Sequence, residues 1–227
     1  MSGDDANPEP AVRQHREPYT VPLVFLAAVI VPQVLVPAQN RVGPDWEVPV
    51  AELIMLALLV LIAARPGPVP RGARPLLLVL GSLLVLANMV AAARLVQLVL
   101  TQGRYEGVVP SANRLLIAGA MVLATNIVTF GLLYWQLDGG GPAGRVSGSN
   151  NAPDFSFPQS TDPASSNWIP KYFDYFYVAY TNVVAFSPTD TNPMSHRAKA
   201  LMLVQSLVSL GVIVVVLARV INILPAT

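Results

Sequence analysis

The most informative segment of this chain runs from Tyr172 to Leu207, YFDYFYVAYTNVVAFSPTDTNPMSHRAKALMLVQSL. Its first part, 172–185, is aromatic and apolar, but it has only about fourteen residues, whereas a helix needs about twenty to cross a bilayer. Pro188 follows closely and cannot continue a helix. We therefore expect 172–185 to enter a membrane partway and turn back. A short full crossing is the alternative, and it would place Asp174 inside the membrane.

The composition of the whole chain is that of an integral membrane protein. Of its 227 residues, 53% are hydrophobic and only 12% are charged, and the mean hydropathy is +0.53. The net charge of +1 argues against a nucleic-acid partner. The chain has no cysteine, which excludes disulfides, thiolate metal sites and cysteine nucleophiles.

Long apolar runs predict an all-α fold of about five transmembrane helices. The first run is short and contains Pro32, Gln33 and Pro37, so it is the weakest of the five. If 172–185 also crosses, the fold has six spanning helices. The expected helices cover residues 20–37, 48–64, 75–100, 113–137 and 196–224.

The chain divides into three regions on this interpretation. Residues 1–19 are polar and mixed in charge, and we expect a disordered tail there. Residues 20–110 form a three-helix membrane region. Residues 111–227 form a second unit whose parts are an outer helix at 113–137, a polar loop at 139–169, the short helix at 172–185 and an inner helix at 196–224.

The order of these parts in 111–227 resembles the pore module of potassium channels. That module has an outer helix, a turret, a short pore helix, a filter of backbone carbonyls and an inner helix. The segments TN…FGLLYWQLDGGGP, PDFSFPQ and TNVVAFSPTDT also look like those of a family of uncharacterised bacterial membrane proteins described as channel-like. The resemblance implies an oligomer with a shared pathway for monovalent cations.

The filter departs from the potassium-channel pattern. Aligned on the turn, the signature Thr-Val-Gly-Tyr-Gly falls on Val183, Val184, Ala185, Phe186 and Ser187, and both glycines are missing. Because only glycine adopts positive φ freely, Ala185 and Ser187 would be strained in a potassium filter.

We therefore do not expect potassium selectivity. Polar side chains near the turn could instead line a wider and weakly selective pathway. The candidates are Thr181, Asn182, Ser187 and Asp190 at the turn, together with Gln205 and Gly211 as pore-facing positions of the inner helix.

Other polar residues in the apolar runs have simpler interpretations. Arg94 is close enough to a helix end to extend to the membrane surface, and Glu52 is similarly close to the start of its helix. Asn88 and Asn126 are mid-helix amides, which usually make hydrogen bonds between helices.

The polar loop at 139–169 and the distribution of basic residues indicate opposite orientations in the membrane. A channel-type loop enters from outside, so 139–169 should be external. The positive-inside rule indicates the reverse, because nine Lys and Arg residues gather on the face that carries this loop and five on the other. A full crossing by 172–185 would remove the conflict.

The sequence predicts a multi-pass protein of a bacterial plasma membrane that forms a homo-oligomer and a weakly selective cation pathway. The alternative is a non-conducting scaffold or accessory subunit that retains the channel fold. A small-solute transporter has less support, because the sequence shows no repeated halves. We expect no cofactor and no enzymatic activity. The two histidines, His15 and His196, lack metal-ligand spacing.

Overall fold

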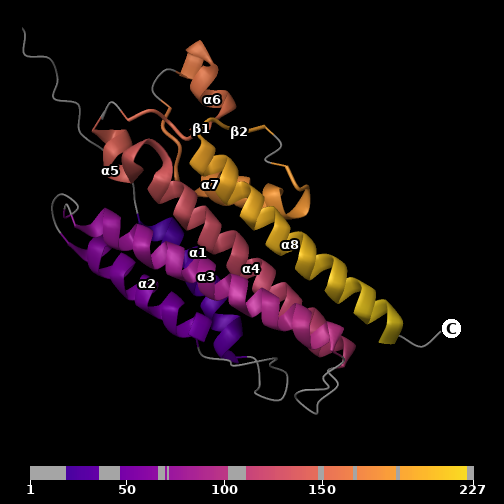
Figure 1. Ribbon diagram of the computed structural model, residues 1–227. Helices are drawn as coiled ribbons and strands as arrows, with labels where there is room; N and C mark the ends of the chain where they lie inside the picture. The colour runs from indigo at the N-terminus through magenta and orange to yellow at the C-terminus, as the bar shows by residue number, and fades with distance from the viewer. Residues whose placement is uncertain are drawn as a thin grey trace, which may run out of the picture.

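The protein is a bundle of long helices, with shorter elements gathered at one end (Figure 1). The computed structural model describes residues 19–35, 47–65, 70, 72–101, 111–147, 151–165, 168–187 and 190–223. The long helices are α1 (Thr20–Leu35), α2 (Glu47–Ala64), α3 (Ala73–Leu100), α4 (Ala112–Leu137) and α8 (His196–Ile223). The shorter elements are η2 (Asp138–Gly140), α5 (Gly141–Val146), β1 (Phe155–Ser156), α6 (Pro158–Thr161), η3 (Pro163–Ser165), α7 (Tyr172–Val184) and β2 (Asn192–Pro193).

The expectation of an all-helical fold is confirmed. The described residues are helical apart from loops and one pair of two-residue strands. Four helices, α2, α3, α4 and α8, are long and apolar enough to cross a membrane. The fifth, α1, has 16 residues, or about 24 Å at 1.5 Å per residue, against a bilayer core of about 30 Å.

Consecutive long helices run in opposite directions. Arg74 at the start of α3 bonds to carbonyls at the end of α4, and Tyr19, just before α1, packs edge-on against Trp135 near that same end. Glu47 at the start of α2 instead reaches Arg94 in the last part of α3. One end of the bundle, which we call the junction end, therefore holds the starts of α1 and α3 and the end of α4.

The chain on either side of α7 lies at this junction end. Strand β1, which precedes α7, pairs antiparallel with β2, which follows it, with Phe155 opposite Pro193 and Ser156 opposite Asn192. The start of α8 comes directly after β2. The chain therefore leaves the junction end, forms α7 and returns to the same end before α8 begins.

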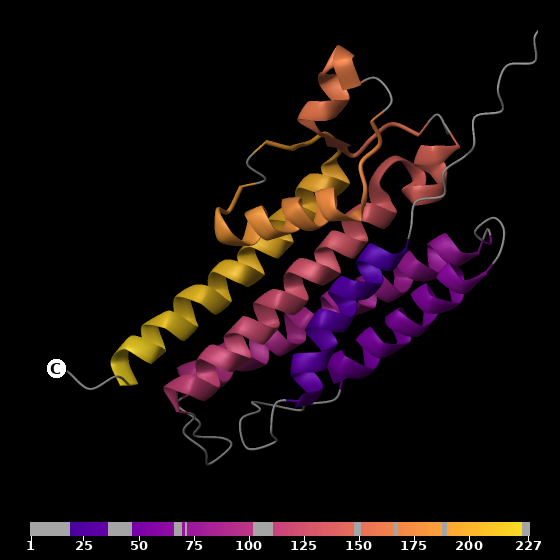
Figure 2. The same ribbon diagram turned by 180° about the vertical axis from the view of Figure 1, so that it is seen from behind.

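The far end of α7 lies partway along α8. Asn182, two residues before the end of α7, donates a hydrogen bond of 3.0 Å to the carbonyl of Met202 and one of 2.8 Å to the side chain of Gln205. Gln205 is nine residues after His196, or about 13 Å along the helix. Figure 2 shows α7 beside the first half of α8. With 13 residues, α7 spans about 20 Å and stops within the length of the bundle.

Candidate functional site

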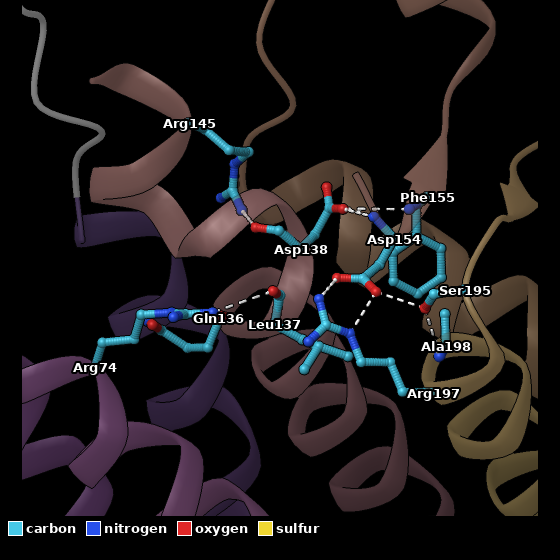
Figure 3. A network of polar contacts seen from close by, with 10 residues as sticks. All are labelled: Arg74, Gln136, Leu137, Asp138, Arg145, Asp154, Phe155, Ser195, Arg197 and Ala198. Atoms are coloured by element: carbon cyan, nitrogen blue, oxygen red, sulfur yellow. Dashed lines mark hydrogen bonds and ion pairs between the residues drawn. The ribbon is translucent and has the colours of Figure 1, made fainter. Parts of the chain in front are cut away.

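A polar junction joins the end of α4, strand β1 and the start of α8 (Figure 3). At its centre is Asp154, whose side chain is 1% exposed and accepts two hydrogen bonds from Arg197, of 2.6 and 2.7 Å. Ser195 also donates to this carboxylate, and its Oγ accepts the backbone N–H of Ala198, so Ser195 is the N-cap of α8. Two-point pairing with arginine is among the strongest polar contacts in proteins, so it fixes where α8 begins.

Asp138 ties the same strand to α4 and to α7. Its carboxylate accepts the backbone N–H groups of Asp154 and Phe155 and the hydroxyl of Tyr175. A carboxylate at a helix C-terminus is disfavoured by the helix dipole. Three donors offset that cost here, so Asp138 holds strand β1 and the first turn of α7 against the end of α4.

Two arginines cover the carbonyls that the last turn of α4 leaves unpaired. Arg145 of α5 donates 2.8 Å hydrogen bonds to the carbonyls of Trp135 and Asp138, and its guanidinium lies 5.0 Å from the centre of the Tyr175 ring. Arg74 of α3 reaches the carbonyls of Gln136 and Leu137. Positive charge at this position also complements the helix dipole.

A second polar network, inside the bundle, holds α7 against α8. The side-chain oxygen of Gln205 accepts hydrogen bonds of 2.8 Å from the Tyr134 hydroxyl and from Asn182, and its amide nitrogen donates one of 3.0 Å to the carbonyl of Ala179. Ser206 donates to the Asn182 oxygen. Gln205 is fully buried and Asn182 is 2% exposed. This network fixes the depth that α7 reaches along α8.

The residues expected to form a filter fall into two groups. Thr181, Asn182 and Val183 are buried in the bundle, and the Thr181 hydroxyl bonds to carbonyls of its own helix. The residues of the turn that follows are exposed, namely Val184, Ala185, Phe186, Ser187 and Asp190. Among these described residues, the three directly after Val183 are apolar, and Ser187 and Asp190 are polar.

The turn after α7 takes its left-handed conformation at Phe186. Its φ is +51°, and it is the one non-glycine residue with positive φ among the residues the structure describes. Ala185 has φ −104° and ends the helix. The turn is thus a left-handed helix cap that carries phenylalanine where glycine is usual. The filter conformation of a potassium channel, which would need positive φ at 185, is not adopted at that residue.

The two expected pore-facing positions of α8 differ in their surroundings. Gln205 points to α7 and α4, where its hydrogen-bonding groups are used. Gly211 is partly exposed, and a Cβ built there would meet no atom within 4 Å. Gly211 therefore lies on an open face of the helix.

Some of the polar contacts were predictable from the sequence and others were not. Asn126 donates to Asn88, and Asn88 to the carbonyl of Val122, so both amides bond between helices as expected. Arg94 pairs with Glu47 at 2.9 Å, and both side chains are half exposed. The roles of Asp138 and Asp154 had no signal in the sequence beyond their place beside glycine and proline, because their partners are distant in the chain.

Within the described ranges no three His, Cys, Asp or Glu side chains come together as a metal site. The chain matches no protein-family model, no curated protein and no solved structure.

Proposed function

We propose that the protein is an ion channel-like membrane protein in which α7 is a re-entrant pore-type helix. Helices α1, α2, α3, α4 and α8 span the membrane, and copies of the chain assemble around a pathway that is weakly selective for monovalent cations. The observation that carries the proposal is the hairpin. The β1–β2 pair holds both of its ends at one end of the bundle, and Asn182 seats its tip partway along α8.

The arrangement of α4, α7 and α8 supports this function over a simple helical anchor. A short helix held between two long ones, followed by a turn partway along the bundle, is the framework that presents a loop to a pore. One face of α7 is left uncovered in a single chain, since Phe173, Tyr177, Tyr180 and Val184 are 43–58% exposed. In an oligomer this face would meet a second copy or lipid.

Ion flux into vesicles tests the proposal. Purified protein reconstituted into lipid vesicles should pass sodium and potassium with little preference, at rates above those of protein-free vesicles. No flux above that control, across a range of pH and voltage, would refute conduction. A strictly monomeric protein after gentle solubilisation would argue against a shared pathway.

A non-conducting scaffold or accessory subunit is the second candidate, and one observation favours it. Two of the polar side chains expected to line the pathway, those of Asn182 and Gln205, are buried and bonded to each other, so they are not free to contact an ion. Restoring both glycines, Ala185→Gly with Ser187→Gly, discriminates the two candidates. A gain of potassium flux would show a framework that can form a pore, and no gain would favour the scaffold.

A further inference from the structure

A single carboxyl group is buried among α1, α2 and α4, away from the hairpin. Glu52 of α2 is fully buried. Its Oε2 accepts a 2.8 Å hydrogen bond from Nε2 of Gln33 on α1, and the same nitrogen lies 3.1 Å from the hydroxyl oxygen of Thr125 on α4. The other carboxyl oxygen, Oε1, is buried without a hydrogen-bond partner. Three helices thus meet at one carboxyl group, and only one of its two oxygens has a hydrogen-bond partner.

This carboxyl lies deep in the bundle, although Glu52 is only the sixth residue of α2. Its neighbour Thr125 is the fourteenth of the 26 residues of α4, a helix long and apolar enough to cross a membrane. Glu52 is therefore level with the middle of that helix. The expectation that Glu52 lies near a membrane surface is wrong for this reason.

No charged side chain among the described residues pairs with the carboxyl. Helix α1 contains no charged residue. The charged residues of the other packed helices are near their ends: Arg74 and Arg94 on α3, and Arg114 on α4. Arg94 pairs with Glu47 and Arg74 with carbonyls of α4. An ionised and unpaired carboxylate at this depth is costly, and a carboxyl that persists in such a place is typically one that exchanges a proton.

We propose that Glu52 is a proton-binding site in the membrane interior, held by Gln33 and Thr125. The contacts favour a proton over a metal cation. Gln33 presents an N–H donor to the carboxyl and not an oxygen, and a cation site needs several oxygen ligands directed at one point. A proton needs one free carboxyl oxygen, and Oε1 is free.

A hydrophobic carbodiimide tests this proposal in the full chain in membranes. Dicyclohexylcarbodiimide adds to a protonated carboxylic acid. The first adduct is hydrolysed where water reaches it, and it rearranges to a stable acylurea where water is scarce. Peptide mass spectrometry should find the stable adduct on Glu52. Labelling should fall as the pH is raised from about 5 to about 9, by about tenfold per pH unit once the acid is mostly ionised.

Two variants locate the reaction. Glu52→Gln should lose the adduct. Glu47→Gln, which removes a half-exposed acid on the same helix, should keep it. The measurement on the wild-type chain needs no variant, so the proposal remains testable if Glu52→Gln does not fold. It also needs no ion flux, so its outcome is independent of the channel-like function.

Two results would overturn the assignment. If Glu52 stays unlabelled at every pH, while carboxyl groups elsewhere in the unfolded chain react, then it does not hold an exchangeable proton. If sodium chloride protects Glu52 and choline chloride at equal ionic strength does not, then the ligand is sodium and the site is a cation site.

Discussion

Gly131 of α4 lies against the backbone of Phe176 of α7. A Cβ on Gly131 would stand 3.2 Å from the Cα of Phe176, which is closer than a Cβ normally approaches, and 3.5 Å from its nitrogen, which is ordinary contact. The missing side chain therefore sets the distance between the two helices. Because Phe176 also packs on Phe25 of α1, with ring centres 4.2 Å apart, this contact fixes α7 against two helices together.

Gly131→Ala should push α7 away from α4. The added methyl meets backbone, which cannot rotate aside, so we expect a loss of about 1–3 kcal/mol of stability. The unfolding midpoint in detergent measures it. Gly211→Ala is the matched control, since its Cβ meets nothing within 4 Å and alanine gains up to about 1 kcal/mol over glycine inside a helix. Equal effects of the two substitutions would contradict the close contact.

Gln205→Leu should weaken the contact between α7 and α8. It removes the partner of the Tyr134 hydroxyl and the donor to the Ala179 carbonyl, so we expect destabilisation of about 2–4 kcal/mol from buried groups left unpaired. Ser209→Ala is the control, because the Ser209 hydroxyl bonds only to a carbonyl of its own helix. A loss no larger than that of the control would show that the network does not hold α7.

Arg197→Ala should leave the buried carboxylate of Asp154 without its charged partner. The Arg197 side chain is 56% exposed, so solvent weakens the pair and we expect a loss of about 2 kcal/mol. The thermal midpoint of Arg197→Ala should therefore fall well below that of Lys199→Ala, which removes an exposed charge two residues later. Matching midpoints would mean that the pair does not secure the start of α8.

Phe186→Gly and Phe186→Ala separate backbone strain from side-chain contacts. Both remove the ring, but only glycine adopts φ +51° freely. The glycine variant should be more stable than the alanine variant by about 1 kcal/mol. An alanine variant of equal or greater stability would show that the turn relaxes to another conformation.

Single cysteines report on which side of the membrane the hairpin begins and ends. The native chain has no cysteine, so Ser147→Cys and Met194→Cys, both at exposed positions, can be labelled without background. With a membrane-impermeant maleimide, both should react from one side and Asn222→Cys, near the end of α8, from the other. Reaction of Ser147→Cys and Met194→Cys from opposite sides would establish a full crossing, and the labelled side decides the orientation.

Helix positions were predictable from the sequence because apolar runs and proline breaks are local. The expected helix 172–185 is observed as Tyr172–Val184, and the expected helix 196–224 as His196–Ile223. The described helix starts differ from the expected ones by at most two residues, which is the usual uncertainty of a helix boundary, and the expected ends at 36–37 and 224 lie outside the described residues.

The depth of Glu52 was not predictable, because it depends on how far α2 is offset along α4. The offset depends on tertiary contacts such as those of Gln33 with both Glu52 and Thr125, and no local pattern encodes it. The pairing of Asp154 with Arg197 was not predictable for a similar reason. Asp154 and Arg197 are 43 residues apart, and a lone aspartate beside proline in a loop normally predicts only a turn.

The pair formed by Asp154 and Arg197 also orders events during synthesis. The ribosome makes Asp154 and then all of α7 before it reaches Arg197, so the hairpin is complete in sequence while the residue that closes it does not yet exist. Its two-residue strand pair likewise waits for Asn192. Contacts of α7 with α4, such as that of Tyr175 with Asp138, can form earlier, whereas the contacts that close the hairpin form only after α8 has begun to emerge.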